Sequence, residues 1–423
     1  MPIILNKAEL ATSNLRKNAL DILEAGLEAI NTEKILRRKI SVVDGILKMA
    51  ELPSLNVREG FGGELYLKSF EKIFFVGIGK CALDGAKVIE NILGDYLTDG
   101  IALGVIADST ESFFMPKKIR SFAGTHPYPS EQNVEITKKI LEMVKGLTEK
   151  DLVITLISGG GSALFELPIE GVSLNEIIET TKKLTAKGAD IYELNKVRKE
   201  MSQVKGGKFA ELCRPAKMIS LLFSDVLGND ISIIASGPTV LPSSSQGEGQ
   251  FREAERGGVM NILIASNHDA LEAMKSKAEE LGFNTTIETE KLSGNARDVG
   301  KELALRKLEP KNCLLFGGET TVIIPENHGV GGRNQEVALA ALSFMQQNSI
   351  LICVASDGFD NTDHAGAIAD IELFEKSKSL NISPEEYLKK SDSYNFFKKV
   401  GGALYTEKLG SNVSDLCIII RNG

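Results

Sequence analysis

The chain has 423 residues, of which 43% are hydrophobic and 25% are charged, as in globular proteins too long for one ordinary core. Its net charge of −8 and the lack of a basic stripe argue against a nucleic-acid surface. No apolar run reaches the roughly 18 residues of a membrane helix, and the N-terminus lacks a secretory signal, so we expect a cytoplasmic protein with no membrane partner.

The cysteines and histidines exclude two further classes of protein. Five cysteines stand far apart, at 81, 213, 313, 353 and 417, and no two form a C-x-x-C pair. The four histidines are also dispersed. We therefore expect reduced thiols, with neither a disulfide framework nor a zinc site.

The chain opens with a helical pattern over residues 8–50, in which Gly26 and Gly45 are expected to interrupt or end helices. The first predicted strand, 72–76, runs into Gly77-x-Gly79-Lys80-x-Ala82 and then a helix. This is formally the G-x-G-x-x-A dinucleotide fingerprint. However, the next acidic residue at a strand end, Asp108, comes 31 positions after Gly77, where the usual spacing is about 20. Lys80 inside the loop favours a phosphoryl group over a nicotinamide cofactor.

The chain is organised around residues 152–164. Leu152–Ile157 is apolar or β-branched throughout, which predicts a strand buried on both faces. It is followed by Ser158-Gly159-Gly160-Gly161-Ser162. Three glycines allow positive φ and close backbone approach, so we interpret the loop as a cradle for phosphate or carboxylate. The alternative is a flexible strand-to-helix turn.

Polar residues also occur on a predicted helix and at later strand ends. Asp190 is expected to cap the helix that carries Asn195 and Arg198 on one face, with Leu194, Val197, Met201 and Val204 on the core side. Asp225 follows the predicted strand 218–223, where it suits a general base or a Mg²⁺ contact, although an Asx turn is the alternative. His126, in a loop with two prolines, suits either substrate orientation or a structural role.

Residues 242–258 have the composition of a linker, so we predict domains over 1–245 and 246–423. The second domain is expected to begin with a strand over 261–265. Further on, strand ends or helix starts carry Glu319, Arg333, Asn334 and Asp357 in glycine-bearing loops. Asp357, Asp360 and Asp363 together suggest a site for a metal or a hydroxyl group, or else an acidic surface loop. Arg333 at a helix start favours contact with a carboxylate or phosphate.

In combination, these segments resemble the glycerate 2-kinases of the MOFRL type. The motifs that carry the resemblance follow one another along nearly the whole chain: Gly77-x-Gly79-Lys80, His126-Pro127-x-Pro129, Ser158–Ala163, Asn195-x-Val197-Arg198-Lys199, Lys205-Gly206-Gly207, Ser224-Asp225-Val226, Ala235–Thr239, Gly317-Gly318-Glu319, Gly332–Glu336 and Ser356-Asp357-Gly358. The resemblance implies two α/β domains, a Rossmann-like N-terminal one and a smaller C-terminal one, with the active site in the cleft between them. It also implies phosphorylation of D-glycerate at its 2-hydroxyl, with ATP and Mg²⁺.

We assign site residues on this combined basis. The expected catalytic residues are Lys80 and Arg333, as charge stabilisers, and Asp225, as base or metal contact. The expected substrate- or phosphate-binding residues are Gly79, Ser158, Gly159, Gly160, Gly161, Ser162, Asn195, Arg198, Glu319 and Asn334. Asp225 and Asp357 are the expected metal ligands. The loop Asp360-Asn361-Thr362-Asp363-His364 is shorter than the family's pattern, which leaves the roles of Asp360 and Asp363 open, and 242–258 is shorter and more polar than the family's connection.

Two other functions stay open at this point. The G-x-G-x-x-A match supports an NAD(P)H-dependent hydroxypyruvate reductase, which Lys80 opposes. A non-catalytic ligand-binding protein is the other alternative. The sequence does not decide between a monomer and a homo-oligomer.

Overall fold

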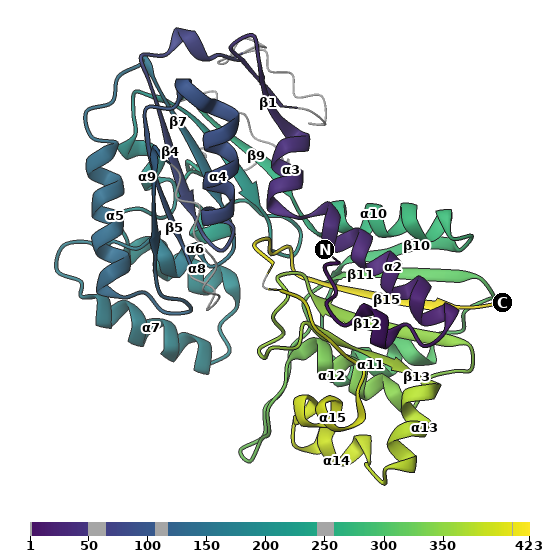
Figure 1. Ribbon diagram of the computed structural model, residues 1–423. Helices are drawn as coiled ribbons and strands as arrows, with labels where there is room; N and C mark the ends of the chain where they lie inside the picture. The colour runs from purple at the N-terminus through teal and green to yellow at the C-terminus, as the bar shows by residue number, and fades with distance from the viewer. Residues whose placement is uncertain (1, 50–64, 106–116, 243–257, 408) are drawn as a thin grey trace. The chain divides into compact units, whose positions relative to one another are not determined.

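The computed structural model describes residues 2–49, 65–105, 117–242, 258–407 and 409–423, and the chain divides into two compact units (Figure 1). One, here called the parallel-sheet unit, is Thr32–Ala265, and the other, the mixed-sheet unit, is Met1–Asn31 with Ser266–Gly423. The predicted α/β class with two domains is confirmed. Within the described part of the chain, no helix is both long enough and apolar enough to span a membrane.

Within the described residues, the parallel-sheet unit is built on a six-stranded sheet in the order β6-β5-β4-β7-β8-β9, and every pairing in it is parallel. Its strands are β4 (Lys72–Ile78), β5 (Asp99–Gly104), β6 (Ile119–Ala123), β7 (Asp151–Ile157), β8 (Lys217–Phe223) and β9 (Val259–Ala265). Its helices are α3 (Thr32–Lys39), α4 (Ala82–Leu93), α5 (Glu131–Met143), α6 (Gly161–Leu164), α7 (Leu174–Ala186), α8 (Ile191–Met201) and α9 (Lys208–Leu212).

The central strand β7 is buried on both faces, as its unbroken apolar sequence predicts. Val153 and Ile157 belong to a core cluster that includes residues of α5 and α9. Ile154 points to the opposite face, where Ile89 and Leu93 of α4 line a small apolar cavity with it. The helices on the two faces therefore keep water from the middle of the sheet and leave the strand ends as the place for polar groups.

The helical pattern predicted over residues 8–50 is wrong for its last part, from Ile40 onward. Residues Ile40–Val43 and Ile46–Met49 form the antiparallel strands β1 and β2, and β3 (Leu65–Tyr66) pairs with β2. Asp44 and Gly45 connect them with φ of 52° and 78°. Two successive residues with positive φ make the tight hairpin turn for which Asp-Gly is a preferred sequence, and this local preference overrides the apolar spacing.

The mixed-sheet unit has, in its described residues, a six-stranded sheet in the order β10-β11-β15-β12-β13-β14. Its strands are β10 (Asn284–Leu292), β11 (Asn312–Gly318), β12 (Ser349–Ala355), β13 (Gly366–Asp370), β14 (Ala403–Leu404) and β15 (Asp415–Arg421). Its helices are α1 (Lys7–Leu10), α2 (Asn14–Ala29), α10 (Asn267–Glu280), α11 (Ala296–Leu305), α12 (Arg333–Leu342), α13 (Ile371–Ser379), α14 (Pro384–Lys389) and α15 (Ser393–Val400). The last strand, β15, lies between β11 and β12 and is antiparallel to both.

The division between the units differs from the predicted one at both ends of the first domain. Strand β9, expected to open the second domain, pairs with β8, so the parallel-sheet unit extends to Ala265. The first 31 residues belong to the mixed-sheet unit, because α2 packs on α10. Gly26 does not interrupt α2: it lies inside the helix, where a Cβ would come 2.6 Å from Met274 Cγ of α10. The buried Arg16 guanidinium also forms two hydrogen bonds with Asp370, 2.6 and 2.8 Å long.

Candidate active site

Two glycine-bearing loops meet at the carboxyl edge of the parallel sheet. After β4 the chain continues to β5 and β6 on one side, and it then returns to place β7 on the other side of β4. In open α/β sheets, ligands bind at this switch in strand order. The backbone N–H of Lys80, after β4, donates to the carbonyl of Gly159, after β7, at 2.9 Å. The two predicted loops are therefore joined at the place where this class of fold binds ligands.

Gly79 is required by close packing, and Gly160 by its left-handed backbone. Gly79 has φ of 112°, and a side chain there would overlap Ser158. At Gly160, which has φ of 82°, a Cβ would come 3.5 Å from Lys80 Cγ and 3.3 Å from the His126 ring. The loops after β4, β6 and β7 thus converge around Gly160. Lys80 is half-buried and His126 is exposed, so both side chains lie at the surface of this edge.

Asp225 extends the same edge from the end of β8. It is half-buried, and its negative charge acts on the buried thiol of Cys81 in the loop after β4. Burial is the main cause that raises the pKa of Cys81 to about 12, and the charges of Asp84 and Asp225 add to it. Cys81 is therefore a protonated packing residue, and Asp225 is a carboxylate close to the first glycine loop.

Helix α8 begins as predicted, since Asp190 and Glu193 form a capping box. The predicted orientation of the helix is wrong. Asn195 is 1% exposed, whereas Leu194, Val197 and Met201 are only half-buried. The buried side is polar because Asn195 Oδ1 accepts a hydrogen bond of 2.6 Å from Ser236. Burial also lowers the pKa of Arg198, against the opposing charge of Glu166.

Ser236 is a residue of the candidate site that sequence reasoning missed. It lies in a run of three left-handed residues, Ala235, Ser236 and Gly237, with φ of 50°, 63° and 60°. Left-handed backbone costs a non-glycine residue about 1–2 kcal/mol, and such strain is concentrated at functional sites. The Ser236 hydroxyl is also 2.9 Å from that of Ser162. The loop Ala235–Gly237 thereby connects the glycine loop to α8.

The mixed-sheet unit holds a second cluster, centred on Arg333 at the first turn of α12. Its guanidinium contacts Asp415, the first residue of β15, at 2.5 and 3.0 Å, and Glu319, just after β11, at 2.8 and 3.2 Å. Burial opposes the charge on Arg333, but the two carboxylates outweigh it and raise the pKa of the guanidinium. Burial also raises the pKa of Asp415, although Arg333 counteracts this. Two predicted site residues, Glu319 and Arg333, therefore lie in direct contact, with Asp415 as a third member of the cluster.

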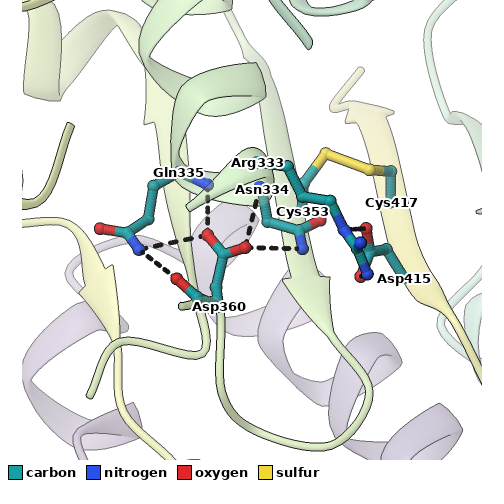
Figure 2. Close-up of a disulfide and its surroundings, with 7 residues drawn as sticks. All are labelled: Arg333, Asn334, Gln335, Cys353, Asp360, Asp415 and Cys417. Carbon is teal, nitrogen blue, oxygen red and sulfur yellow. Dashed lines mark hydrogen bonds and ion pairs between the residues drawn. A yellow bond between two sulfur atoms is a disulfide. The ribbon is translucent and has the colours of Figure 1, made fainter. Parts of the chain in front are cut away.

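Asp360 fixes the start of α12. Its buried carboxylate accepts hydrogen bonds from the backbone and side-chain amides of Asn334 and of Gln335, at 2.9–3.2 Å (Figure 2). Gln335 in turn contacts the buried His364 at 3.0 Å. Burial, together with the charge of Asp415, raises the pKa of Asp360 to about 6. The open question about Asp360 is thus answered in structural terms: it caps the helix that presents Arg333.

Asp225 lies in the parallel-sheet unit and the half-buried Asp357 in the mixed-sheet unit, and their pairing at a metal stays a prediction. The expectation that every cysteine is reduced fails. Cys353 and Cys417 are not reduced: they form a disulfide between β12 and β15, two residues along β15 from Asp415 (Figure 2). The two cysteines are 64 residues apart in the chain and become neighbours only through strand register, with Cα atoms 4.2 Å apart. Cys81, Cys213 and Cys313 are free and buried, as expected.

The remaining predicted residues follow the same division. Gly79, Lys80, residues 158–162, Asn195, Arg198 and Asp225 belong to the parallel-sheet unit, and Glu319, Arg333, Asn334 and Asp357 to the mixed-sheet unit. Asp415 was missed because it opens a strand, whereas the strand-associated site residues predicted from the sequence follow one. Asp108 and most of 242–258 lie outside the described residues.

Comparison with known proteins agrees with this two-part organisation. A family model described as a domain of unknown function, DUF4147, matches residues 18–259, and the MOFRL family model matches residues 312–415. The D-glycerate 2-kinase of Thermotoga maritima is 36% identical over 438 residues, which cover 96% of this chain and 98% of that protein. The glycerate 2-kinase of Pyrococcus horikoshii is 36% identical over 95% of this chain and 98% of its own length. The crystal structure of a Thermotoga maritima glycerate kinase matches with a TM-score of 0.80 and 35% identity, over 96% of this chain and 99% of that one.

Proposed function

The chain belongs to the MOFRL family of glycerate kinases, and from this premise we propose that it transfers the γ-phosphoryl group of ATP to the 2-hydroxyl of D-glycerate, giving 2-phosphoglycerate and ADP. The observation that carries the proposal is the bond between Lys80 N–H and the Gly159 carbonyl, which joins two glycine loops at the switch point of the parallel sheet. This arrangement supports the proposal, because a lysine and the backbone amides of glycine loops are groups that bind a phosphoryl group or a carboxylate.

The reaction needs a base and charge stabilisation. Asp225, at the end of β8, is the proposed acceptor of the 2-hydroxyl proton. The hydroxyl oxygen then forms a bond to the γ-phosphorus as the bond from that phosphorus to the ADP oxygen breaks. Lys80 and Arg333 would stabilise the negative charge on the transferring group, which is the main requirement of phosphoryl transfer. Arg333 is oriented for this role by Glu319, Asp415 and the helix start that Asp360 caps.

Mg²⁺ is part of the proposal, and this chain offers it one or two carboxylate ligands. The described residues contain no group of three or more His, Cys, Asp or Glu side chains that could hold a metal by themselves. Mg²⁺ commonly takes only one or two carboxylates and completes its shell with water and substrate phosphates. In its alternative role as a metal contact rather than a base, Asp225 would hold an ion that arrives with ATP, with Asp357 proposed as a further ligand. The ion would neutralise charge on the β- and γ-phosphates.

The structure of the first glycine loop weighs against the reductase. In a nicotinamide site, the first glycine of G-x-G-x-x-A makes the tight turn after the strand. Here Gly77 lies inside β4, paired with Ala102 and Leu156, and the turn begins only at Gly79. The loop therefore departs from the fingerprint at its first position.

The test is a steady-state assay of ADP release with D-glycerate, ATP and Mg²⁺. We expect turnover by the wild type and a loss of at least about a hundredfold in kcat for Lys80→Ala and Asp225→Asn, the range of one missing catalytic group. Lys145→Ala is the control, because Lys145 is a surface residue with a side chain 72% exposed. No ADP release, together with oxidation of NADH or NADPH on adding hydroxypyruvate, would replace the kinase by the reductase. Unchanged kcat in both variants would overturn the roles of Lys80 and Asp225.

A cytoplasmic location and a homo-oligomer are also part of the proposal. The three buried free thiols support a reducing compartment, while the Cys353–Cys417 disulfide does not. Sedimentation velocity of the purified chain would decide the oligomeric state.

A further inference from the structure

A chain of hydroxyl groups leads from the glycine loop of the parallel-sheet unit into its core. Ser162 lies 2.9 Å from Ser236, and Ser236 donates to Asn195 Oδ1 at 2.6 Å. Ser236 and Asn195 are buried, with exposures of 0% and 1%, while Ser162 is half-buried at the sheet edge. We call these three residues the Ser162 relay.

The direction of the relay follows from hydrogen-bond chemistry. An amide oxygen can only accept, so the single proton of Ser236 is committed to Asn195. Ser236 must then accept from Ser162, and the Ser162 proton is committed as well. The oxygen of Ser162 is left with acceptor capacity toward the open side of the loop. It is therefore suited to a ligand group that donates, and unsuited to a phosphate or carboxylate oxygen.

The backbone is built to hold this direction. Ser236 keeps its left-handed conformation through Gly206, whose N–H donates to the Ser236 carbonyl at 3.0 Å. Gly161 lets the glycine loop approach, because a Cβ there would come 2.6 Å from that of Ala235. Asn195 Nδ2 is buried and has no hydrogen-bond partner among the described residues, so the amide is held through its oxygen alone.

The parallel-sheet unit also contains a matched hydroxyl chain that is closed. Thr155 donates to Ser220, Ser220 contacts Thr239, and Thr239 donates to Asn261 Oδ1, at 2.8, 3.0 and 2.7 Å. Thr155, Ser220 and Thr239 are all 0% exposed. Both chains end on an asparagine oxygen, but only the Ser162 relay begins at a half-buried residue of the glycine loop. The closed chain serves only the core, whereas the Ser162 relay can serve a ligand.

We infer that Ser162 accepts a hydrogen bond from the 3-hydroxyl of D-glycerate and so determines specificity for this acceptor, an inference that rests on the proposed kinase function. The relay ends on a neutral amide that cannot take up a proton, so it suits the hydroxyl that keeps its proton during the reaction. The 2-hydroxyl loses its proton in the proposed transfer and belongs with the base, Asp225. Ser236 and Asn195 are positioning residues, since they act through Ser162.

The test compares D-glycerate with D-lactate, which is the same acid without the 3-hydroxyl. We expect the wild type to prefer D-glycerate by at least about tenfold in kcat/KM, the size of one lost hydrogen bond with its unpaired partner. Ser162→Ala should lower kcat/KM for D-glycerate about tenfold and leave that for D-lactate within about twofold. Ser220→Ala, in the closed chain, is the control and should leave the preference unchanged.

Variants of Asn195 test the direction of the relay. Asn195→Asp keeps an acceptor for Ser236 and should retain most of the preference, whereas Asn195→Leu and Ser236→Ala should lose it as Ser162→Ala does. Equal loss in Asn195→Asp and Asn195→Leu would mean that the relay runs the other way and would overturn the inference.

Other outcomes separate this inference from the proposed function. Phosphorylation of D-glycerate with no preference over D-lactate in the wild type, which requires no variant to fold, would overturn the inference and leave the kinase standing. The inference would also be overturned if Ser162→Ala changed only the KM for ATP, because Ser162 would then accept a hydrogen bond from a ribose hydroxyl of ATP. No phosphorylation of D-glycerate at all would instead overturn the proposed function itself.

Discussion

The two units build their polar clusters by different physical means. In the parallel-sheet unit, backbone groups and hydroxyls at strand ends are brought together by glycines, and Lys80 stands at their surface. In the mixed-sheet unit, side-chain charges do the work: Arg333 is clamped by Asp415 and Glu319, with Asp360 behind it. The first cluster leaves acceptor capacity at Ser162. In the second cluster, most of the N–H donors of the Arg333 guanidinium are already bonded to Asp415 and Glu319.

This difference suggests that the glycine-loop cluster serves mainly to bind a ligand, whereas the Arg333 cluster also stabilises its unit. A site made of backbone and hydroxyl groups can exchange its contacts for those of a substrate at little electrostatic cost. A buried charge cluster is costly to leave half-formed, because a lone charge in the interior loses its hydration without compensation. We therefore expect variants of the mixed-sheet cluster to lose stability as well as activity, and variants of the glycine loops to lose mainly activity.

The largest effect is expected from Arg333→Ala. It leaves the carboxylate of Asp415, with a side chain only 4% exposed, without its cation. Removing one partner of a buried pair costs about 3–5 kcal/mol of unfolding free energy. Arg306→Ala is the matched control, since its side chain is also 35% exposed but one of its carboxylate partners, Glu302, is 69% exposed. It should cost about 1 kcal/mol or less in urea unfolding. Equal losses in both variants would show that the clamp does not stabilise the unit.

The next effect is expected from Cys417→Ser. The disulfide closes a loop of 64 residues, and its removal should cost about 2–4 kcal/mol, confined to the mixed-sheet unit. Hydrogen exchange should be faster than in the wild type in β12 and β15 and unchanged in β7. Cys313→Ser, a buried free thiol of the same sheet, controls for the polar hydroxyl. If reduced wild-type protein exchanges as slowly as oxidised protein, the disulfide adds no stability.

A smaller, pH-dependent effect is expected at Asp360. Its pKa is raised from 3.8 to about 6 on folding, so between these values only the unfolded chain loses the proton, and stability falls as pH rises. Asp360→Asn removes this fall but loses acceptors for the α12 amides. The difference in unfolding free energy, wild type minus variant, should decrease by about 1–3 kcal/mol from about pH 4 to pH 6 and then stay level. A difference that rises with pH would contradict the raised pKa.

The smallest effect is expected from Asp190→Ala, which removes the cap of α8. Loss of an N-cap costs about 1 kcal/mol. Because the cap is at the exposed end of the helix, exchange should quicken mainly in the first turn after Asp190, with a few-fold rise in the KM for D-glycerate through Asn195. Lys196→Ala, an exposed position of the same helix, is the control. A change in kcat alone would be inconsistent with a positioning effect through α8.

What could be predicted from the sequence was local. The buried strand β7, the positive φ in the glycine loop after it and the Asp190 cap each depend on residues close together in the chain, and all three are confirmed. The Asp44-Gly45 turn is also local, but the apolar residues on either side of it have helical spacing, and this pattern hides the turn in the sequence.

What could not be predicted depends on strand register and on long-range pairing. Cys353 meets Cys417, and Asp415 meets Arg333, only because the last strand inserts between β11 and β12. The membership of β9 in the first sheet has the same origin, since it depends on pairing with β8. Asn195 shows a further limit: a polar residue on an amphipathic helix is expected to face solvent, and only its partner Ser236, 41 residues later, reverses this.

Phosphorus NMR of the product made from D-glycerate, ATP and Mg²⁺ shows which hydroxyl is phosphorylated. We expect 2-phosphoglycerate, because Asp225 activates the 2-hydroxyl while Ser162 holds the 3-hydroxyl. A signal of 3-phosphoglycerate would contradict this placement of the two hydroxyls, and a spectrum with no phosphorylated product would contradict the kinase function.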